Sequence, residues 1–438
     1  MKLVKMSLLA ATLIASSAFA IDNTKVAGDA KLFYGTADAG DASLFNKDGA
    51  YGQAAAKVGL TTDLTEGVSA GASITALSTL GLEGQLVNGV WEATNGVSDA
   101  FWFDEAWIAG TVGKTTGKIG RMELDTPLVF SETWSIATNT FEAAVLINQD
   151  IPDTTLVGAY VGGSNGGNIS RLLTGKASVI SPIDNNSTGT NFHQFYNGAY
   201  TVGAINNSWK PLTVQGWYYN ATSAANAYWL QADVALDFGL LLGGQYTGLD
   251  IKNAALGAPL VDSSNTAYAV MAGYEMKDTF KITAAYSQTG KDDDNGIGAG
   301  MNLAASGQSK LYTEAWWNYG YITKNDTAAF NVTVTTPEEL TWAGLGLYYT
   351  QSTSKDSLTV YDATGANGVV SDLVMSEITL EATKSFGPLD MSLLYIMTNA
   401  EDQNSKGDVA LAGDPTTTVQ TEKGQSYNTI QAYLTYNF

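Results

Sequence analysis

Few side chains in this sequence have the types and spacing that catalysis requires. The chain contains no cysteine, which excludes thiol chemistry, disulfides and thiolate metal sites. A hydrolase built on a serine and histidine pair would depend on His193, the only histidine, lying at the rim of a strand beside a serine. His193 follows a long connection in the segment TNFHQ, so we interpret it as a solvated loop residue and expect no enzymatic site.

The acidic run Asp292, Asp293 and Asp294 offers oxygen ligands of the kind that Ca²⁺ prefers. An EF-hand is excluded, because aligning Gly296 with the required glycine places Lys291 at the first ligand position and no Glu at the bidentate position. Two interpretations stay open, a Ca²⁺ site in an external loop and an ordinary solvated acidic loop. Neither requires a cofactor for function.

The charge balance argues against nucleic acid as a partner. The chain has 22 Lys+Arg against 43 Asp+Glu, a net charge of -21, and its only arginines are Arg121 and Arg171. Binding to phosphate requires a basic surface, which such a chain does not offer. With 46 Gly and 8 Pro in 438 residues, the composition favours strands joined by tight turns.

Residues 1–20 have the features of a bacterial secretory signal peptide. Two lysines precede a short apolar stretch, and the segment ends in Ala-Phe-Ala at residues 18–20. This combination predicts export and cleavage after Ala20, with residues 21–438 forming a single domain.

After the signal peptide the sequence alternates with the period of two that is typical of β-strands. Apolar side chains such as Leu230 and Ala232 alternate with polar ones such as Gln231 and Asp233. The pattern predicts eighteen strands, an even number as in single-chain bacterial barrels. They are expected at residues 25–35, 50–62, 66–77, 99–112, 116–122, 138–149, 153–162, 195–206, 211–221, 226–237, 239–248, 266–276, 279–289, 308–320, 339–351, 374–385, 388–399 and 426–438.

Three further features favour a transmembrane barrel over a soluble sandwich. Short connections alternate with long ones, as periplasmic turns and external loops do, although segment 321–338 is long where a short turn is expected. All eight prolines fall in connections or at strand starts. The chain ends on Tyr436 and Phe438, the kind of aromatic end that the barrel assembly machinery reads. We therefore predict an all-β fold, a transmembrane antiparallel β-barrel of about eighteen strands that contacts outer-membrane lipid and encloses water.

The polar face of the expected strands would line the lumen of this barrel. Acids outnumber bases on that face, so we predict a mild preference for cations that salt weakens. A second interpretation is that much of the acidic charge solvates the external loops. The candidate wall residues are Lys31, Lys57, Glu142, Asp233, Lys281, Glu314 and Glu381, joined by Asp29, Asp237, Lys310 and Glu377.

Several segments resemble the OprD-like outer-membrane porins. They are GRMELDTPL at 120–128, NTFE at 139–142 and NQDIPDTTLV at 148–157. The segments GDAKLFY at 28–34 and LYTEAW at 311–316 look like the epsilonproteobacterial major outer-membrane-protein branch of that family. The resemblance implies an eighteen-stranded homotrimeric porin that passes small hydrophilic solutes.

In porins of this type the third external loop folds into the lumen and forms the constriction. The resemblance assigns that role to residues 123–138, with Glu123, Asp125 and Glu132 as constriction acids. Strict alternation from the preceding strand would point the side chain of Arg121 at lipid. A bulge or an early strand end would instead turn it towards the lumen, and we expect Arg121 to face the lumen. Arg121 is the only arginine near the constriction, whereas substrate-specific members carry a ladder of arginines for carboxylates.

The main hypothesis is therefore an outer-membrane porin that passes ions and small polar solutes by diffusion. A substrate-specific outer-membrane channel is the second hypothesis, and it would show saturating flux for one solute. A barrel-embedded hydrolase is the third, and it would need His193 for activity. A secreted β-rich adhesin is the fourth, and it would be soluble without detergent.

Overall fold

The computed structural model describes the greater part of the chain after the segment expected to be cleaved. The expected signal peptide, residues 1–20 with cleavage after Ala20, lies outside the described residues. These are residues 23–40, 42–82, 86–87, 99–132, 136–166, 192–222, 224–252, 263–293, 296–304, 308–361, 368–400, 408–411, 414–420 and 426–438.

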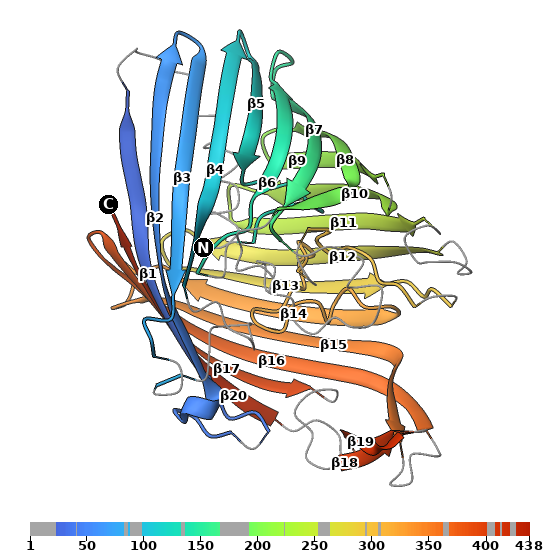
Figure 1. Cartoon of the computed structure of the whole chain (residues 1–438). Coiled ribbons are helices and arrows are strands. Elements are labelled where there is room, and N and C mark those ends of the chain that lie inside the picture. Colours follow the sequence, from blue (N-terminus) through green and yellow to red (C-terminus); the bar gives the residue numbers. More distant parts are fainter. Residues whose placement is uncertain are drawn as a thin grey trace.

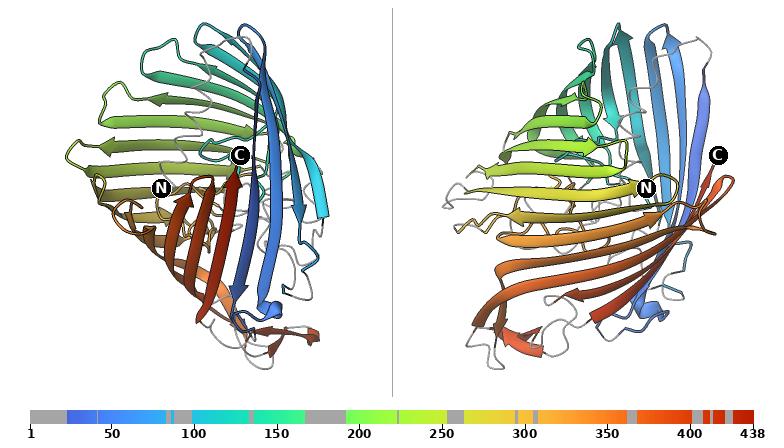
Figure 2. Two further views of the ribbon diagram at one scale, coloured as in Figure 1. Left: turned by 90° about the vertical axis from the view of Figure 1, so that its left-hand side faces the viewer. Right: turned by 180° about the vertical axis from the view of Figure 1, so that it is seen from behind.

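Eighteen antiparallel strands close into one barrel (Figure 1 and Figure 2). Each strand pairs with its neighbours along the chain, and β1 (Lys25–Ala37) pairs with β20 (Ser426–Asn437) to close the ring. The strands between them are β2 (Ala50–Thr65), β3 (Val68–Ser78), β4 (Asp99–Val112), β5 (Thr115–Met122), β6 (Phe141–Asn148), β7 (Thr154–Ser164), β8 (His193–Asn206), β9 (Leu212–Ala221), β10 (Ala225–Ala235), β11 (Leu240–Ile251), β12 (Ser263–Met276), β13 (Phe280–Thr289), β14 (Thr327–Thr336), β15 (Gly344–Tyr361), β16 (Gly368–Phe386) and β17 (Leu389–Ala400).

Two short strands and one helical turn lie outside this ring. β18 (Asp408–Leu411) and β19 (Asp414–Gln420) form a separate hairpin between β17 and β20. The 3-10 helix η1 (Lys47–Gly49) precedes β2, and the side chain of Asn46 caps it by accepting the N–H of Asp48. The described residues contain no helix with the length and apolar character needed to cross a membrane.

Long and short connections alternate around the barrel, as predicted. One end, which we call the turn end, has brief connections such as 66–67, 113–114 and 387–388. The opposite end, the loop end, has most of the long ones, with the connections 222–224 and 362–367 as short exceptions, the second because β15 and β16 are longer than predicted. An eighteen-stranded barrel with this arrangement confirms the predicted fold class.

One predicted strand was wrong. Residues 308–320 lie in the long connection between β13 and β14, and the strand missing from the prediction is β14. Leu311, Thr313 and Ala315 are all buried, because this connection packs inside the barrel. Alternate burial in an irregular segment thus produced the period of two that is typical of a strand. The unusual length of 321–338 disappears, since its middle is β14 and the turn after it is short.

The two faces of the wall differ as expected for a barrel in lipid. Apolar side chains such as Val58, Ile108, Leu146 and Leu230 are exposed on the outward face. Their strand neighbours turn inward, where many are small or polar and are covered by loops. This sorting of apolar and polar residues follows from alternation along each strand.

Gly120 of β5 allows that strand to lie close to β4. Its φ is +131°, and an added Cβ would lie 2.1 Å from the carbonyl oxygen of Ala106. Gly120→Ala should therefore destabilise the folded barrel by more than about 2 kcal/mol, because the strain cannot be relieved without breaking strand pairing. The measurement is the fraction of folded, heat-modifiable protein on unheated gels and the midpoint of thermal unfolding.

The matched control is Gly158→Ala in β7. A Cβ at Gly158 would meet nothing within 4 Å, and the position lacks a positive φ. This variant should fold like the parent, and equal behaviour of the two variants would contradict the role of Gly120.

Candidate pore constriction

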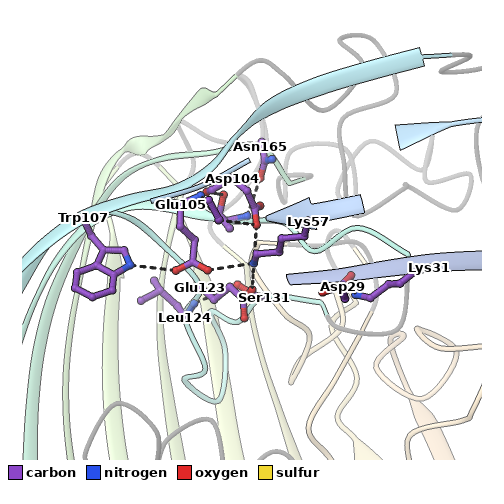
Figure 3. A network of polar contacts seen from close by, with 12 residues as sticks. Asp29, Lys31, Lys57, Asp104, Glu105, Trp107, Glu123, Leu124, Ser131 and Asn165 are labelled. Atoms are coloured by element: carbon purple, nitrogen blue, oxygen red, sulfur yellow. Dashed lines mark hydrogen bonds and ion pairs between the residues drawn. The ribbon is translucent and has the colours of Figure 1, made fainter. Parts of the chain in front are cut away.

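A cluster of charges projects into the lumen where the third loop leaves the wall (Figure 3). The ammonium group of Lys57 on β2 lies 2.7 Å from Asp104, 3.1 Å from Glu105 and 3.2 Å from Glu123. Asp104 and Glu105 belong to β4, and Glu123 directly follows β5. Lys57, Asp104, Glu105 and Glu123 therefore form a single ion cluster, which we call the neck cluster.

A β-bulge places two consecutive acids of β4 in this cluster. Ser73 of β3 is opposite Glu105, whereas the next residue, Ile74, is opposite Phe103, so Asp104 is the extra residue. The N–H of Glu105 donates to the hydroxyl of Ser73 at 3.1 Å, which helps to hold the bulge. Asp104 and Glu105 consequently both reach Lys57 although they are neighbours in sequence.

Lys118 of β5 adds a second ammonium group to the neck cluster. Its Nζ lies 4.1 Å from the centre of the Trp107 ring, and the indole N–H of Trp107 donates to Glu105 at 3.3 Å. Three carboxylates thus face two ammonium groups, which leaves one negative charge in excess. Burial raises the pKa of Glu123 above its usual range, and the charge of Lys57 opposes this shift.

The connection between β5 and β6 crosses the lumen, as the resemblance implied. On one side, Ile136 belongs to the same buried cluster as Trp102 of β4. On the other side, Leu128 is buried with Trp229 of β10, and its N–H donates to the phenol oxygen of Tyr219 at 3.3 Å. The third loop is therefore stretched between opposite parts of the wall.

Most of the described residues of a second connection, between β13 and β14, also lie inside the barrel. The N–H of Leu303 donates to the carbonyl oxygen of Leu128 at 2.8 Å. The side-chain amide of Asn302 pairs with the backbone of Phe130, donating to its oxygen at 2.8 Å. We call residues 297–304 and 308–326 the second inner loop, and these bonds join it to the third loop.

An ion pair completes the junction between the two inner loops. Asp125 of the third loop pairs with the buried Lys310 of the second inner loop. Burial lowers the pKa of Lys310, and the carboxylate of Asp125 opposes this shift. The sequence placed Lys310 on the wall, but its position on an inner loop follows from the misassigned strand.

Glu377 of β16 anchors the second inner loop to the wall. Its carboxylate, which is 1% exposed, accepts the backbone N–H groups of Trp316, Trp317 and Asn318 at 2.7 to 3.2 Å. It also accepts the side-chain amide of Asn318 at 2.8 Å and the hydroxyl of Thr379 at 3.0 Å. Glu377 was predicted to be an acidic residue lining the lumen. In the structure its carboxylate satisfies buried backbone donors.

Five other predicted wall residues, Asp29, Lys31, Asp233, Lys281 and Glu381, lie on inward-facing strand positions, whereas Asp237 is exposed in the turn between β10 and β11 and is not a wall residue. Lys31 is 3.5 Å from Asp29, and Lys281 is 3.7 Å from Glu275. The remaining two accept tyrosine hydroxyls: Glu381 that of Tyr348 at 2.8 Å, and Asp233 that of Tyr312 from the second inner loop.

Glu132, the third predicted constriction acid, is buried within the third loop. It is 2% exposed, and its N–H donates to the side chain of Asn139 at 2.8 Å. The constriction acids thus divide between the neck cluster (Glu123), the loop junction (Asp125) and the interior of the loop (Glu132).

Arg121 and Glu142 do not face the lumen, contrary to our expectation. β5 pairs with both neighbours in continuous register, so Arg121 stays on the same outward face as Ile119. Two guanidinium nitrogens of Arg121 donate to Glu142 at 3.0 and 2.9 Å, and the group lies 3.9 Å from the ring centre of Phe192. Because β5 has no bulge before Arg121, nothing turns this side chain inward.

Glu314 is not a wall residue either, because its segment is part of the second inner loop. Burial raises the pKa of Glu314 well above its usual range, and the nearby charge of Glu377 adds to this effect.

The described members of the acidic run make contacts within the protein. Asp292 accepts the hydroxyl of Ser263 at 3.1 Å and the N–H of Ile297 at 3.0 Å, while Asp293 pairs with Lys291 at 2.8 Å. Asp294 lies outside the described residues. A Ca²⁺ site in this loop therefore stays a prediction.

Three residues of the neck cluster, Asp104, Glu105 and Lys118, were not predicted from the sequence. A signal for the first two was present, because strict alternation would turn one of two consecutive acids towards lipid. Adjacent charges inside a spanning strand thus indicate a bulge that brings both to the lumen. Among the described residues, Asp104, Glu105 and Glu123 form the one acidic group tight enough to suit a metal ion, and Lys57 pairs with all three.

Comparison with known proteins identifies this architecture. No family model and no curated protein sequence matches the chain. Among solved structures, Acinetobacter baumannii OccAB1 matches with a TM-score of 0.69 at 12% identity, over 97% of this chain and 99% of that chain. Pseudomonas aeruginosa OccK8 (OprE) matches with a TM-score of 0.66 at 14% identity, over 96% and 99%. The outer membrane protein opdK from Pseudomonas aeruginosa matches with a TM-score of 0.65 at 12% identity, over 94% and 98%.

At these identities the likeness establishes a shared fold. The chain has the fold of the OprD/Occ barrels over nearly its whole length, in agreement with the resemblance found in the sequence. Membership of the epsilonproteobacterial branch stays a prediction.

Glu377→Gln should release the second inner loop. One acceptor oxygen becomes an NH₂ donor facing backbone N–H groups, which should cost about 2 to 4 kcal/mol of local stability. We expect faster hydrogen exchange at residues 316–318, measured by mass spectrometry of peptic fragments.

Glu381→Gln is the control for this variant. Glu381 lies on the same face of the same strand, and among the described residues its hydrogen-bond donor is the hydroxyl of Tyr348. The substitution should leave exchange at 316–318 unchanged. Equal protection in the Glu377→Gln protein would show that the anchor is dispensable.

Proposed function

We propose that this chain, which shares the fold of the OprD/Occ outer-membrane barrels, is an outer-membrane porin. It would pass ions and small hydrophilic solutes by passive diffusion, without a chemical reaction. The observation that carries the proposal is a closed barrel whose lumen is narrowed by inner loops around the neck cluster. A water-filled path bounded by charged groups suits small polar solutes.

The excess charge of the neck cluster supports mild cation selectivity. Asp104, Glu105 and Glu123 outnumber Lys57 and Lys118 by one charge. At the junction of the inner loops, Asp125 and Lys310 cancel. The neck cluster therefore supports the predicted sign of selectivity, although the acids Glu142, Asp237 and Glu314 and the base Lys310, first assigned to the wall, do not line it.

A substrate-specific channel is the second candidate, and the arginine positions weigh against it. Recognition of carboxylates would need basic groups aligned along the lumen. Arg121 faces outward, so the lumen contains no arginine among the residues that the structure describes. A general pore fits this wall better than a carboxylate channel.

Export and assembly complete the proposal. Residues 1–20 would direct export and be removed after Ala20, and the barrel would contact outer-membrane lipid through its apolar outward face. Tyr436 and Phe438 are exposed on that face near the turn end, accessible to the barrel assembly machinery. The functional unit would be a homotrimer, as the family resemblance implies.

Planar-bilayer recording tests the proposal. Purified protein should give large, long-lived conductance in groups of three steps, with a reversal potential on the cation side in a salt gradient.

Glu123→Gln should move that reversal potential towards the anion side. A unit charge about 6 Å from the ion path is worth roughly 0.7 kcal/mol in water, or about threefold in cation occupancy before salt screening.

Asp153→Asn is the control, because it removes the same charge from an exposed ion pair with Lys210 at the turn end. It should leave the reversal potential unchanged. Inserted protein without conductance would overturn the porin proposal, while an anion-side potential would overturn only the charge argument.

Cation preference should also fall as the solution becomes acidic. Because burial raises the pKa of Glu123, its charge is lost at a higher pH than that of an exposed glutamate. The wild-type reversal potential should move towards the anion side over that range, measured from pH 8 down to pH 4. The Glu123→Gln protein should show a flatter profile, and identical profiles would rule out Glu123 as the titrating group.

A further inference from the structure

The backbone of β8 is strained within the strand. Tyr196, Asn197 and Gly198 have successive φ values of 54°, 57° and 94°. A positive φ is uncommon outside glycine and is unfavourable for a residue as bulky as Tyr196. Strain of this kind persists only where the surrounding structure holds it, and it clusters at functional sites.

This strain accompanies a bulge of β8 towards the lumen. Between two regular pairs with β7, Gly162 alone lies opposite the four residues 195–198. Phe195 is 2% exposed and Tyr196 is 9% exposed, and both belong to the buried cluster inside the barrel. Regular alternation would have turned one of these two consecutive side chains towards lipid, so the bulge is what brings both of them inward.

Tyr196 uses this position to hold the second inner loop. Its hydroxyl donates to the carbonyl oxygen of Leu303 at 2.6 Å. The N–H of Leu303 in turn donates to the carbonyl oxygen of Leu128 in the third loop at 2.8 Å. On the neighbouring strand β9, the hydroxyl oxygen of Tyr219 accepts the N–H of Leu128 at 3.3 Å. The backbone pair that joins the two inner loops is therefore bonded to a tyrosine of the wall on each side, and we call these four residues the tyrosine bracket.

The bulge also contacts the point where the third loop rejoins the wall. Phe141 is the first residue of β6, and its ring meets that of Phe195 edge-to-face with centres 5.9 Å apart. Both rings are buried. Both inner loops are thus fixed against one short segment of β8.

The hydroxyl of Tyr196 matters because the tyrosine bracket is closed to water. Leu128 and Leu303 are 2% and 3% exposed. A buried carbonyl that loses its donor is destabilised, so without this hydroxyl the junction of the inner loops would open more often. Leu128 follows Glu123 of the neck cluster closely in the chain. Movement of the junction would therefore move the loop that narrows the lumen.

We propose that Tyr196 is a positioning residue of the pore. The bulge of β8 carries its hydroxyl to the junction of the inner loops, and this bond keeps the constriction at one width. Tyr196 acts through Leu303 and Leu128 and not by touching the solute. The inference rests on the porin function proposed above and names the wall residue that keeps the pore steady.

A thiol at the junction tests whether the hydroxyl of Tyr196 keeps it closed. The chain has no native cysteine, and Ala304 beside Leu303 is 0% exposed, so Ala304→Cys provides one thiol that reports opening. In folded protein in detergent, methyl methanethiosulfonate should react slowly with this thiol. Adding Tyr196→Phe should speed the reaction about tenfold, because losing one buried hydrogen bond shifts the opening equilibrium by about that factor.

Tyr200→Phe is the matched control for the labelling. Tyr200 lies on the same strand, but it is 57% exposed on the outward face. Loss of its hydroxyl should leave the reaction of Ala304→Cys as slow as in the parent protein. After thermal unfolding, the thiol should react at equal rates in all three proteins.

Single-channel recording supplies a readout that a purely stabilising residue would not change. The Tyr196→Phe pore should step between sublevels smaller than one full pore, whereas wild-type and Tyr200→Phe pores should stay at one level. Its reversal potential should equal that of the wild type, because Lys57 and Glu123 are unchanged. A residue that contributes stability alone would lower the midpoint of thermal unfolding and leave the current steady.

The outcomes that would overturn the role of Tyr196 differ from those that would overturn the porin. Equal labelling of the Tyr196→Phe and parent proteins would show that its hydroxyl does not hold the junction. Faster labelling with a steady current would show that the junction does not set the width of the pore, and this too would overturn the proposal. Inserted wild-type protein without conductance would overturn the porin function, while the labelling rates would still decide whether Tyr196 holds the junction.

Discussion

Closure of the sheet is the constraint on which the remainder of this structure depends. Hydrocarbon offers no partner for a free N–H or C=O group, and each unsatisfied group there costs several kcal/mol, so a spanning sheet must have no edge. The seam between β1 and β20 meets this requirement up to the last residue. Phe438 and Gly28 exchange two backbone hydrogen bonds at 2.9 and 3.0 Å, and a Cβ on Gly28 would lie 2.2 Å from the carbonyl oxygen of Lys57. The aromatic chain end is thus also the final element of closure.

Closure with eighteen strands creates a second problem, which the inner loops resolve. The wall of so wide a barrel cannot fill the lumen with its own side chains. Irregular backbone that enters the lumen brings N–H groups without ladder partners, and these must find acceptors. Glu377 supplies the acceptors for residues 316–318, and the third loop binds the second through Asn302 and the pair of Asp125 with Lys310. Some side chains of the constriction therefore form hydrogen bonds to the backbone of the inner loops, and others face the path of the solute.

The sequence predicted most of the wall because strand periodicity is a local property. Seventeen of the eighteen expected strands overlap strands of the barrel, and the exception, 308–320, failed for a physical reason. Burial inside the lumen depends on contacts with distant elements, and alternate burial of Leu311, Thr313 and Ala315 imitates the alternation of a strand.

The neck cluster was only partly predictable. Lys57 and Glu123 were identified, but Asp104 and Glu105 depend on a bulge whose position is set by pairing with β3. Alternation alone placed Arg121 outside, and expecting a bulge there led to the wrong face.

The neck cluster also shows why the net charge of a chain is a poor guide to the charge of its pore. The whole protein carries a formal charge of -21, yet the groups around Lys57 sum to a single negative charge. Burying three carboxylates together would be prohibitive without cations, so Lys57 and Lys118 accompany them. Packing of the constriction thus limits the charge that it can hold. Charges in exposed turns, such as Asp153 paired with Lys210, are screened by solvent, so the cost of burying like charges does not limit their number. A weak local field, and not the large overall charge, is what an ion crossing the neck would encounter.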